Sequence, residues 1–202
     1  MSDQPLAALP VSGVILAAGA ASRMGQPKLL LQWKGEPLIC HAARTALQAG
    51  LDPVVVVTGS YAAKMQAALA GLSVRLVHNP DWQTGQSTSV RAGLAALPDH
   101  IQAVIFLLGD QPFVTAGLLL ALVNTYARTR PTILAPFVGE KRANPVLFDR
   151  SIFPALGKLQ GDAGARSIFA QYPPTPMPWP DERLLFDVDT PGDYQRLLAL
   201  ED

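Results

Sequence analysis

Two basic residues follow a turn of small residues near the start of the chain. The apolar run VSGVI leads into LAAGAASRMGQPK, residues 16–28, which contains Gly19 and then Arg23 and Lys28. Such a turn after the first strand of an α/β sheet lets backbone N–H groups approach phosphate, and the two cations can hold its charge. The spacing fits neither G-x-x-x-x-G-K-[ST] nor G-x-G-x-x-G. The residue types alone leave two interpretations open, a triphosphate-binding turn and a surface loop with two solvated cations.

Carboxylates follow two other apolar runs. Asp110 ends AVIFLLGD, and Asp187 and Asp189 lie in FDVDTPGD. Ligands of open α/β sheets bind outside the carboxyl ends of the strands, and Mg²⁺ usually takes one or two protein carboxylates together with phosphate oxygens and water. We therefore predict that two carboxylates from distant strands share one Mg²⁺ ion. In the alternative interpretation, Asp189 only caps the terminal helix or turns the chain.

The elements that must position these residues follow an alternating pattern. Short runs rich in β-branched residues predict buried strands, and the amphipathic segments between them predict helices. The expected strands are 11–17, 53–59, 73–79, 103–110 and 131–137, and the expected helices are 37–50, 61–71, 87–97 and 115–129. Repeated strand–helix–strand units imply right-handed crossovers. The predicted fold is a three-layer α/β/α sandwich around a mostly parallel, Rossmann-like sheet.

The pattern becomes less regular after Pro136. Residues 143–150 predict one more strand, which could be antiparallel, and residues 164–172 predict a helix. The proline-rich segment 172–180 predicts an extended arm over the surface. A short strand is expected over 183–189, followed by a terminal helix with Thr190 as its N-cap.

Composition limits the classes of protein. Hydrophobic residues make up 49% of the 202 residues, which is enough for a sizeable core, and no linker divides the chain, so we expect one domain. The net charge is zero, which argues against nucleic-acid binding. Cys40 is the single cysteine, so an internal disulfide and a multi-cysteine metal site are excluded. The apolar runs are too short to cross a membrane and no signal peptide is evident, so we expect a cytoplasmic protein.

Several motifs occur together in the order of a known family. LAAGAASRMGQPK resembles the signature LAAGxSxRMGxxK, and NPDWQTGQSTSVRAGL, GDQPFV, NPVLF, GDAGAR and DVDTPGDY follow it. From Val14 to about Tyr194 the chain resembles the nucleotidyltransferases of molybdenum cofactor biosynthesis, most closely the molybdenum cofactor cytidylyltransferases. The resemblance implies a fold of the nucleotide-diphospho-sugar transferase type. Within the single domain, residues from about 11 to 113 would bind the nucleotide and residues from about 114 to 202 would lie on the acceptor side.

The resemblance also implies a reaction, in which CTP and molybdenum-bound molybdopterin give the cytosine dinucleotide cofactor and pyrophosphate, and a molybdenum hydroxylase could receive the product. It assigns the nucleotide contacts by position to Leu16, Ala17, Ala18, Gly19, Gln86, Ser87 and Ser89. Arg23 and Lys28 would hold the phosphates and act with Asp110 as the catalytic residues, Asp110 and Asp189 would bind Mg²⁺, and Asn144, Asp162 and Arg166 would face the acceptor.

Two positions depart from the family pattern. Asn144 replaces a histidine of the family's GHPVLF motif, so a group that can titrate near neutral pH is replaced by one that cannot. Thr88 stands where serine is common and keeps the hydroxyl.

Other functions remain as alternatives. A guanylyltransferase of the same cofactor is one, although LAAG at residues 16–19, where guanylyl relatives tend to have LAGG, favours CTP. Another is a nucleotidyltransferase that acts on a phosphorylated sugar or alcohol; no general base accompanies the motifs, which favours an acceptor that is already ionised. A third is a carrier that binds the cofactor without catalysis, against which the retention of Asp110 and Asp189 argues. A nucleophile elbow would need glycine where Ser89 stands, and the missing dinucleotide fingerprint makes a dehydrogenase unlikely on sequence grounds.

Overall fold

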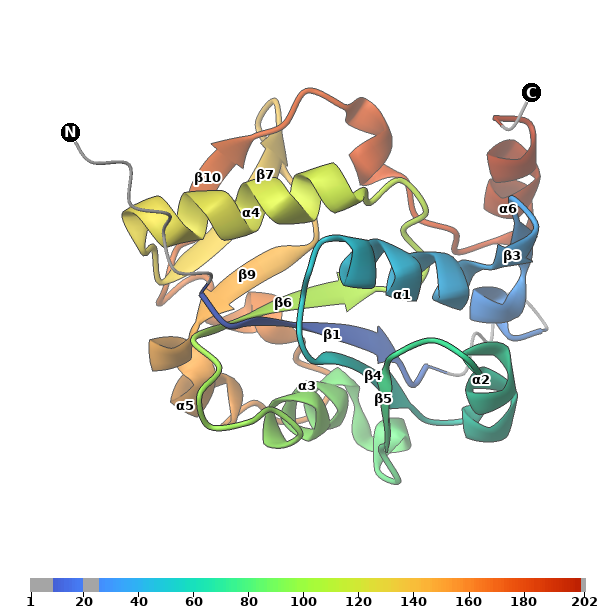
Figure 1. Ribbon diagram of the computed structural model, residues 1–202, viewed down its shortest axis with the longest axis horizontal. Helices are drawn as coiled ribbons and strands as arrows, with labels where there is room; N and C mark the ends of the chain where they lie inside the picture. Colours follow the sequence, from blue (N-terminus) through green and yellow to red (C-terminus); the bar gives the residue numbers. More distant parts are fainter. Residues whose placement is uncertain (1–8, 20–25, 201–202) are drawn as a thin grey trace.

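A single large sheet forms the centre of the protein. The computed structural model describes residues 9–19 and 26–200. The sheet has eight strands in the order β10-β7-β9-β6-β1-β4-β5, with β8 paired to β7 outside this path (Figure 1). The strands are β1 Val11–Ala17, β4 Val54–Thr58, β5 Arg75–His78, β6 Ala103–Leu108, β7 Ile133–Val138, β8 Lys141–Arg142, β9 Val146–Asp149 and β10 Thr175–Pro178.

The half of the sheet formed by β5, β4, β1 and β6 is parallel, as predicted. Strand β1 pairs in parallel with β4 on one side and with β6 on the other, and β4 pairs in parallel with β5. Successive side chains of β1 enter opposite cores, since Val14 and Ile15 are both fully buried but belong to different hydrophobic clusters. Burial on both faces explains the near-continuous apolar runs of these strands.

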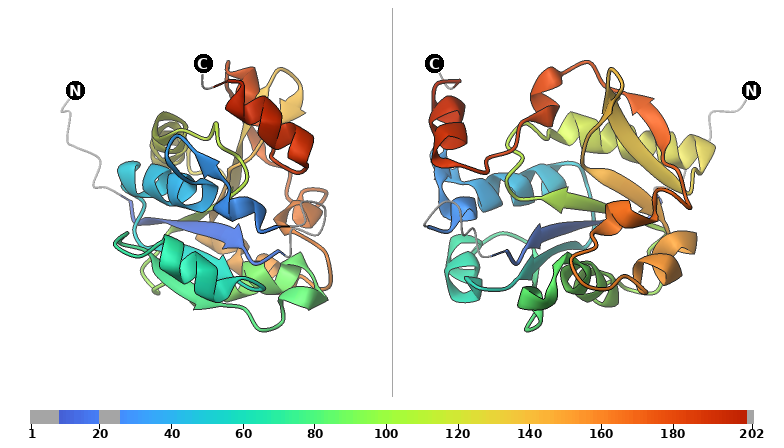
Figure 2. Two further views of the ribbon diagram at one scale, coloured as in Figure 1. Left: turned by 90° about the vertical axis from the view of Figure 1, so that its right-hand side faces the viewer. Right: turned by 180° about the vertical axis from the view of Figure 1, so that it is seen from behind.

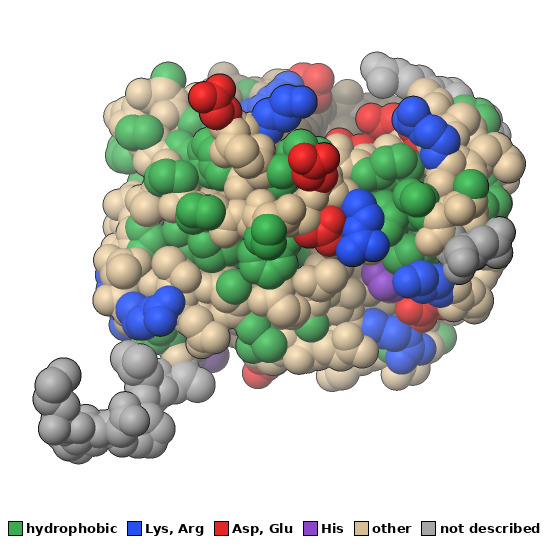
Figure 3. Space-filling model, turned by 90° about the horizontal axis from the view of Figure 1, so that it is seen from above, with side chains coloured by type: hydrophobic (Ala, Val, Ile, Leu, Met, Phe, Trp, Pro, Cys, Tyr) green, Lys and Arg blue, Asp and Glu red, His purple; other side chains and the backbone are tan. Residues whose placement is uncertain are grey.

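Helices cover both faces of the sheet and make the three predicted layers (Figure 1). On one face, α1 (Leu38–Gln48), α2 (Ala62–Ala68) and α4 (Ala116–Thr129) pack into one cluster with Ile15 and Val56. On the other face, α3 (Gln86–Ala95) and α5 (Phe153–Leu156) pack against Val14 and Val57. Seen from above, over α4 and α1, the surface mixes hydrophobic, acidic and basic side chains (Figure 3).

Glycines follow the first two helices at the predicted positions. Gly50 follows α1 with φ +71°, and Gly71 follows α2 with φ +88°. A residue with a Cβ atom is disfavoured at positive φ, so glycine lets the chain turn out of the helix toward the next strand.

The second half of the sheet differs from the predictions in part. Strand β9 is antiparallel to both β6 and β7, as the sequence allowed. The helix expected over 164–172 is wrong in extent, because only a 3₁₀ turn, η5 (Ala165–Ile168), forms there. The strand expected over 183–189 is also wrong: η6 (Glu182–Leu185) occupies its first part, and no strand follows.

The proline-rich segment is an edge strand rather than a free arm. Strand β10 pairs in parallel with β7, and Trp179 N donates a hydrogen bond to Phe137 O at 2.8 Å. Neighbouring residues of a strand direct their N–H groups to opposite sides. Pro176 and Pro178 therefore take the outward-facing positions, where the missing N–H costs no sheet hydrogen bond.

The C-terminal helix α6 (Pro191–Leu198) lies beside a small hairpin formed by β2 (Gln32–Trp33) and β3 (Glu36–Pro37) (Figures 1 and 2). Its N-terminus has the predicted cap: Thr190 and Asp193 form a capping box, and Pro191 is the first helical residue. Leu197 packs with Trp33 of the hairpin. This packing fixes the position of Asp189, which directly precedes the cap.

The remaining short elements are 3₁₀ turns, namely η2 Lys28–Leu30, η3 Trp82–Thr84 and η4 Arg150–Ile152. No helix in the described part of the chain is both long and apolar enough to cross a membrane.

Candidate active site

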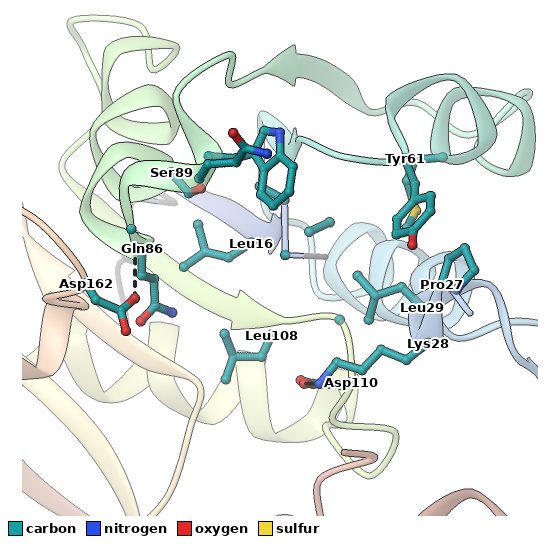
Figure 4. Close-up of a pocket in the computed structure, with 18 of the residues that line it drawn as sticks. Leu16, Pro27, Lys28, Leu29, Tyr61, Gln86, Ser89, Leu108, Asp110 and Asp162 are labelled. Carbon is teal, nitrogen blue, oxygen red and sulfur yellow. Dashed lines mark hydrogen bonds and ion pairs between the residues drawn. The ribbon is translucent and has the colours of Figure 1, made fainter. Parts of the chain in front are cut away.

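A cavity of about 700 Å³ opens at the carboxyl ends of the parallel strands. Leu16 near the end of β1 and Leu108 at the end of β6 lie between its two sides (Figure 4). Lys28 and Asp110 lie on one side, and Gln86 and Asp162 lie on the opposite side. Small-molecule sites usually measure about 300–1,000 Å³, so the volume suits a nucleotide.

The turn after β1 forms one wall of the cavity. Ala17, Ala18 and Gly19, which the family resemblance assigns to the nucleotide, line it. The loop after β4 supports this turn, because Ser60 N donates to Ala18 O and Ser60 Oγ donates to Gly19 O, at 3.4 and 3.3 Å. A Cβ atom at Gly59 would lie 2.4 Å from Ala18 O, so the two loops can approach this closely only with glycine at position 59.

Lys28 joins two carboxylates that are far apart in the sequence. Its Nζ donates to Asp110 Oδ2 at 2.5 Å and to Asp189 Oδ1 at 2.7 Å. Burial by itself would lower the pKa of Lys28, but the charges and hydrogen bonds of the two aspartates outweigh it and raise this pKa above its ordinary value. Lys28 therefore keeps its positive charge at the rim of the cavity.

A third carboxylate lies beside this group. Gln111 Nε2 donates to Asp187 Oδ1 at 2.7 Å. Burial, together with the charges of Asp110 and Asp189, raises the pKa of Asp187 despite that hydrogen bond. Asp187 does not line the cavity, whereas Asp110 and Asp189 do.

The donor set fits a divalent cation that shares its coordination with phosphate. Asp110 Oδ1 is buried and has no hydrogen-bond partner among the described residues, and Asp189 Oδ1 accepts a hydrogen bond from Lys28 Nζ. The described residues contain no group of three His, Cys, Asp or Glu side chains placed to hold a metal by themselves. Two carboxylates completed by phosphate oxygens and water match the preference of Mg²⁺.

The opposite wall is built around the start of α3. Gln86 and Ser89, which the family resemblance also assigns to the nucleotide, line the cavity. Gln86 N donates to Asp162 Oδ1 at 3.4 Å (Figure 4). This contact holds the loop of residues 159–164, the 160s loop, against the N-terminus of α3. Ser89 Oγ accepts from the buried Asn79 Nδ2 at 3.0 Å, which fixes its position. Ser87 takes a different place from the one expected for a nucleotide contact, since it is fully buried and its hydroxyl donates to Gly161 O at 2.7 Å.

The residues expected to face the acceptor are divided. Asp162 lines the cavity, but Asn144 and Arg166 do not. Asn144 Oδ1 lies 3.5 Å from Arg142 Nη1, and Arg142 is close enough to Arg166 for their charges to interact. Arg23, assigned to the phosphates, lies outside the described residues.

Sequence reasoning missed part of the lining. Tyr61 and Met65 at the start of α2, and Trp82 in η3, also line the cavity. Trp82 follows a predicted strand and lies inside NPDWQTGQSTSVRAGL, the motif that also contains Gln86, and this position is the signal that could have identified it.

Comparison with known proteins gives a consistent picture. Residues 13–175 match the protein family described as MobA-like NTP transferase domain. The chain is 35% identical to nicotine blue oxidoreductase of Paenarthrobacter nicotinovorans, over 93% of this chain and 96% of that protein. It is 31% identical to purine catabolism protein PucB of Bacillus subtilis, over 90% of this chain and 93% of that protein.

Solved structures share the fold over almost the whole chain. The crystal structure of Rv0371c from Mycobacterium tuberculosis has a TM-score of 0.85 and 28% sequence identity, and the match covers 95% of this chain and 99% of that one. A second crystal structure of the same protein, in complex with manganese, matches with a TM-score of 0.79 over 94% of this chain and 98% of that one.

Proposed function

The chain belongs to the family of MobA-like NTP transferase domains and is a nucleotidyltransferase, and from this premise we propose that it transfers CMP from CTP to molybdenum-bound molybdopterin. In this reaction a phosphate oxygen of the acceptor forms a bond to the α-phosphorus of CTP. The bond from that phosphorus to the bridging oxygen breaks, and pyrophosphate leaves. The observation that carries the proposal is the position of Lys28 between Asp110 and Asp189, at the rim of a cavity whose wall is the Ala17–Gly19 turn.

The residues of this site have different roles in the proposed nucleotidyl transfer. The small side chains of the turn let the nucleoside lie against the backbone. Lys28 can contact the phosphates and stabilise the negative charge that develops on the leaving pyrophosphate. We assign a phosphate contact to Arg23 as well, on the family motif alone. A Mg²⁺ ion held by Asp110 and Asp189 would offset the charge of the phosphates when bound; the manganese complex of Rv0371c supports a divalent ion in a related protein.

The absence of histidine from the described lining of the cavity fits a phosphorylated acceptor. None of the three histidines is among the residues that line it, and His41 Nε2 lies 3.0 Å from Pro112 O, outside the cavity. A phosphate-ester nucleophile is already ionised at neutral pH and needs no general base. This supports molybdopterin over an acceptor that attacks through an alcohol.

The remaining parts of the proposal rest on the sequence and on the family resemblance. CTP is preferred to GTP on the basis of the LAAG sequence at residues 16–19. We infer one domain over residues 1–202, in which the part from about 11 to 113 binds the nucleotide and the part from about 114 to 202 faces the acceptor. Asn144, Asp162 and Arg166 are assigned to that acceptor side. A cytoplasmic location and a molybdenum hydroxylase as recipient of the product belong to the same proposal.

Calorimetric titration with CTP and with GTP, each with and without Mg²⁺, tests the nucleotide. Tighter binding of CTP that depends on Mg²⁺ is the expected result. Preference for GTP would keep the mechanism and overturn the base. A pyrophosphate-release assay with molybdopterin then tests the acceptor, and binding without release would favour a carrier.

The name of one relative calls for a further control assay. Because nicotine blue oxidoreductase is named for a redox reaction, NADH and NADPH oxidation should be measured in parallel. Pyrophosphate release without oxidation of either dinucleotide is the expected outcome. Oxidation without pyrophosphate release would contradict the proposal.

A further inference from the structure

Two arginines without an acidic partner among the described residues belong to neighbouring segments, because the guanidinium of Arg142 packs on Phe169, three residues after Arg166. Arg142 in β8 is half-buried, and Arg166 in η5 is exposed. Within the described residues, neither guanidinium forms an ion pair, in contrast to Arg44, Arg183 and Arg196. Burial lowers the pKa of Arg142, and the neighbouring positive charge of Arg166 lowers it further, with no carboxylate acting against them. Two adjacent cations that lack a counter-charge destabilise each other until an anion binds.

The side chain of Arg142 is held in place by its surroundings. Its guanidinium lies 4.7 Å from the centre of the Phe169 ring, which itself stacks on Phe148 in β9. Asn144 Oδ1 lies 3.5 Å from Arg142 Nη1. A guanidinium supported by an aromatic ring loses less conformational freedom when it binds an anion.

The arginine pair lies next to the cavity. Asp162, four residues before Arg166, lines the cavity on the side opposite Lys28 and Asp110 (Figure 4). The guanidinium of Arg142 packs on Phe169, three residues after Arg166, so both arginines belong to segments next to that side.

We propose that Arg142 and Arg166 form an anion site that holds the phosphomonoester group of the acceptor beside the nucleotide cavity. This inference rests on the proposed function for the identity of the acceptor, but it concerns residues outside the nucleotide-binding motifs. Planar guanidinium groups bind phosphate oxygens in pairs, and two of them match the charge of a phosphate dianion. Neutralising the acceptor phosphate lets it approach the negatively charged triphosphate. Asn144 orients Arg142 in this arrangement, which gives a role to the position where the family has histidine.

Titration with inorganic phosphate tests the site without any nucleotide. Phosphate binding to the full-length protein is measured by calorimetry for the wild type, Arg142→Gln and Arg166→Gln. Arg128→Gln is the matched control, because Arg128 is exposed in the last turn of α4. We expect binding to weaken by about tenfold or more in each of the first two variants and to stay unchanged in the control. Binding that is unchanged in both, and lost instead in Lys28→Gln, would overturn the proposal, because phosphate would then occupy only the nucleotide side.

Arg142→Lys keeps the experiment informative if Arg142→Gln fails to fold. Lysine keeps the charge but loses the planar fork, so we expect binding between that of the wild type and that of Arg166→Gln. Binding by Arg142→Lys equal to that of the wild type would contradict the paired-guanidinium geometry.

A second measurement separates this proposal from the proposed function. The affinity for CTP with Mg²⁺ should stay within about twofold of wild type in Arg166→Gln, while the KM for the acceptor rises about tenfold or more. If the wild type binds no CTP but its phosphate binding still depends on both arginines, the proposed function fails and the anion site stands. If CTP turns over and the arginine variants leave the KM for the acceptor unchanged, the anion site fails and the proposed function stands.

Discussion

The basic residues on the two sides of the cavity differ in their ion pairing. On one side, which we propose binds the nucleotide, Lys28 is paired with both Asp110 and Asp189. Next to the opposite side, which we propose binds the acceptor, Arg142 and Arg166 form no ion pair among the described residues. Under the proposed function, the lysine would exchange its partners for phosphate when a nucleotide binds, whereas the arginines have no ion-pair partner to release. The nucleotide side would then be adapted to a change of ligands during the reaction, and the acceptor side to the capture of an anion.

The largest expected effect comes from removing the carboxylate that holds Lys28 most closely. Asp110→Ala should lower turnover by about 10³-fold or more, because Lys28 and the proposed metal ion would each lose a carboxylate ligand at the reacting phosphates. The fold should persist, since Lys28 keeps its contact with Asp189. Pyrophosphate release and the thermal midpoint measure the two effects.

Asp99→Ala is the control for that substitution. The side chain of Asp99 is fully exposed, and its nearest cation, Arg150, is 3.8 Å away. Its activity should equal that of the wild type. Full activity in Asp110→Ala would remove the basis for contrasting the two sides.

The next largest effect concerns the contact between Gly85, before α3, and Gly161, in the loop that leads to Asp162. Gly85 has φ +122° and ψ 169°, and a Cβ atom there would lie 2.2 Å from Gly161 O. Gly85→Ala should lower the free energy of unfolding by about 2–4 kcal/mol, because it combines backbone strain with a clash. Gly139→Ala has positive φ but open space around it, so it should cost only about 1 kcal/mol. Urea unfolding compares them, and equal losses would show that the contact with the 160s loop contributes nothing.

A smaller effect separates two neighbouring serines. Ser89 lines the cavity, so Ser89→Ala should weaken CTP binding by about three- to tenfold, the equivalent of one neutral hydrogen bond. Ser87 donates to Gly161 O instead. Ser87→Ala should leave CTP affinity unchanged and lower the free energy of unfolding by about 1 kcal/mol. Calorimetry with CTP and urea unfolding on both variants would reveal the reverse assignment, if Ser87 were the nucleotide contact.

The smallest effect lies in a pair remote from both sides. Tyr126 Oη donates to Asp149 Oδ2 at 2.5 Å. Burial and this hydrogen bond raise the pKa of Tyr126 to about 12, so the donor keeps its proton at neutral pH. Burial would raise the pKa of Asp149, but hydrogen bonds from Ser151 and Tyr126 outweigh it and lower that pKa.

The lowered pKa of Asp149 makes the contribution of the pair depend on pH. It is fully present above the ordinary aspartate pKa of about 4 and is lost as the pH falls through the lower pKa of the folded state. Tyr126→Phe should therefore cost about 1 kcal/mol in unfolding free energy at pH 7 and less below about pH 4. Urea unfolding across this range measures the difference. A constant difference would show that the hydroxyl acts independently of the Asp149 charge, and a change in activity would contradict its separation from the cavity.

The parts of the fold that local sequence encodes were predicted well. The parallel strands and their helices follow from runs of β-branched residues and from glycines such as Gly50 and Gly71. The errors lie after residue 160, where short apolar runs carry no clear period. The expected strand over 183–189 has no neighbouring strand to pair with, so the apolar character of Leu184 serves packing instead.

The sequence by itself determined the order of the elements, the cap at Thr190 and the types of residue available for phosphate and metal, because each depends on neighbours within a few positions. Only the tertiary structure decided which of them meet. Lys28 reaches Asp110 and Asp189 across 82 and 161 positions of sequence. It also decided that Ser89 lines the cavity while Ser87 is buried, and that Arg142 lies near Arg166. Such contacts depend on strand order, register and the packing of distant segments, none of which a local pattern specifies.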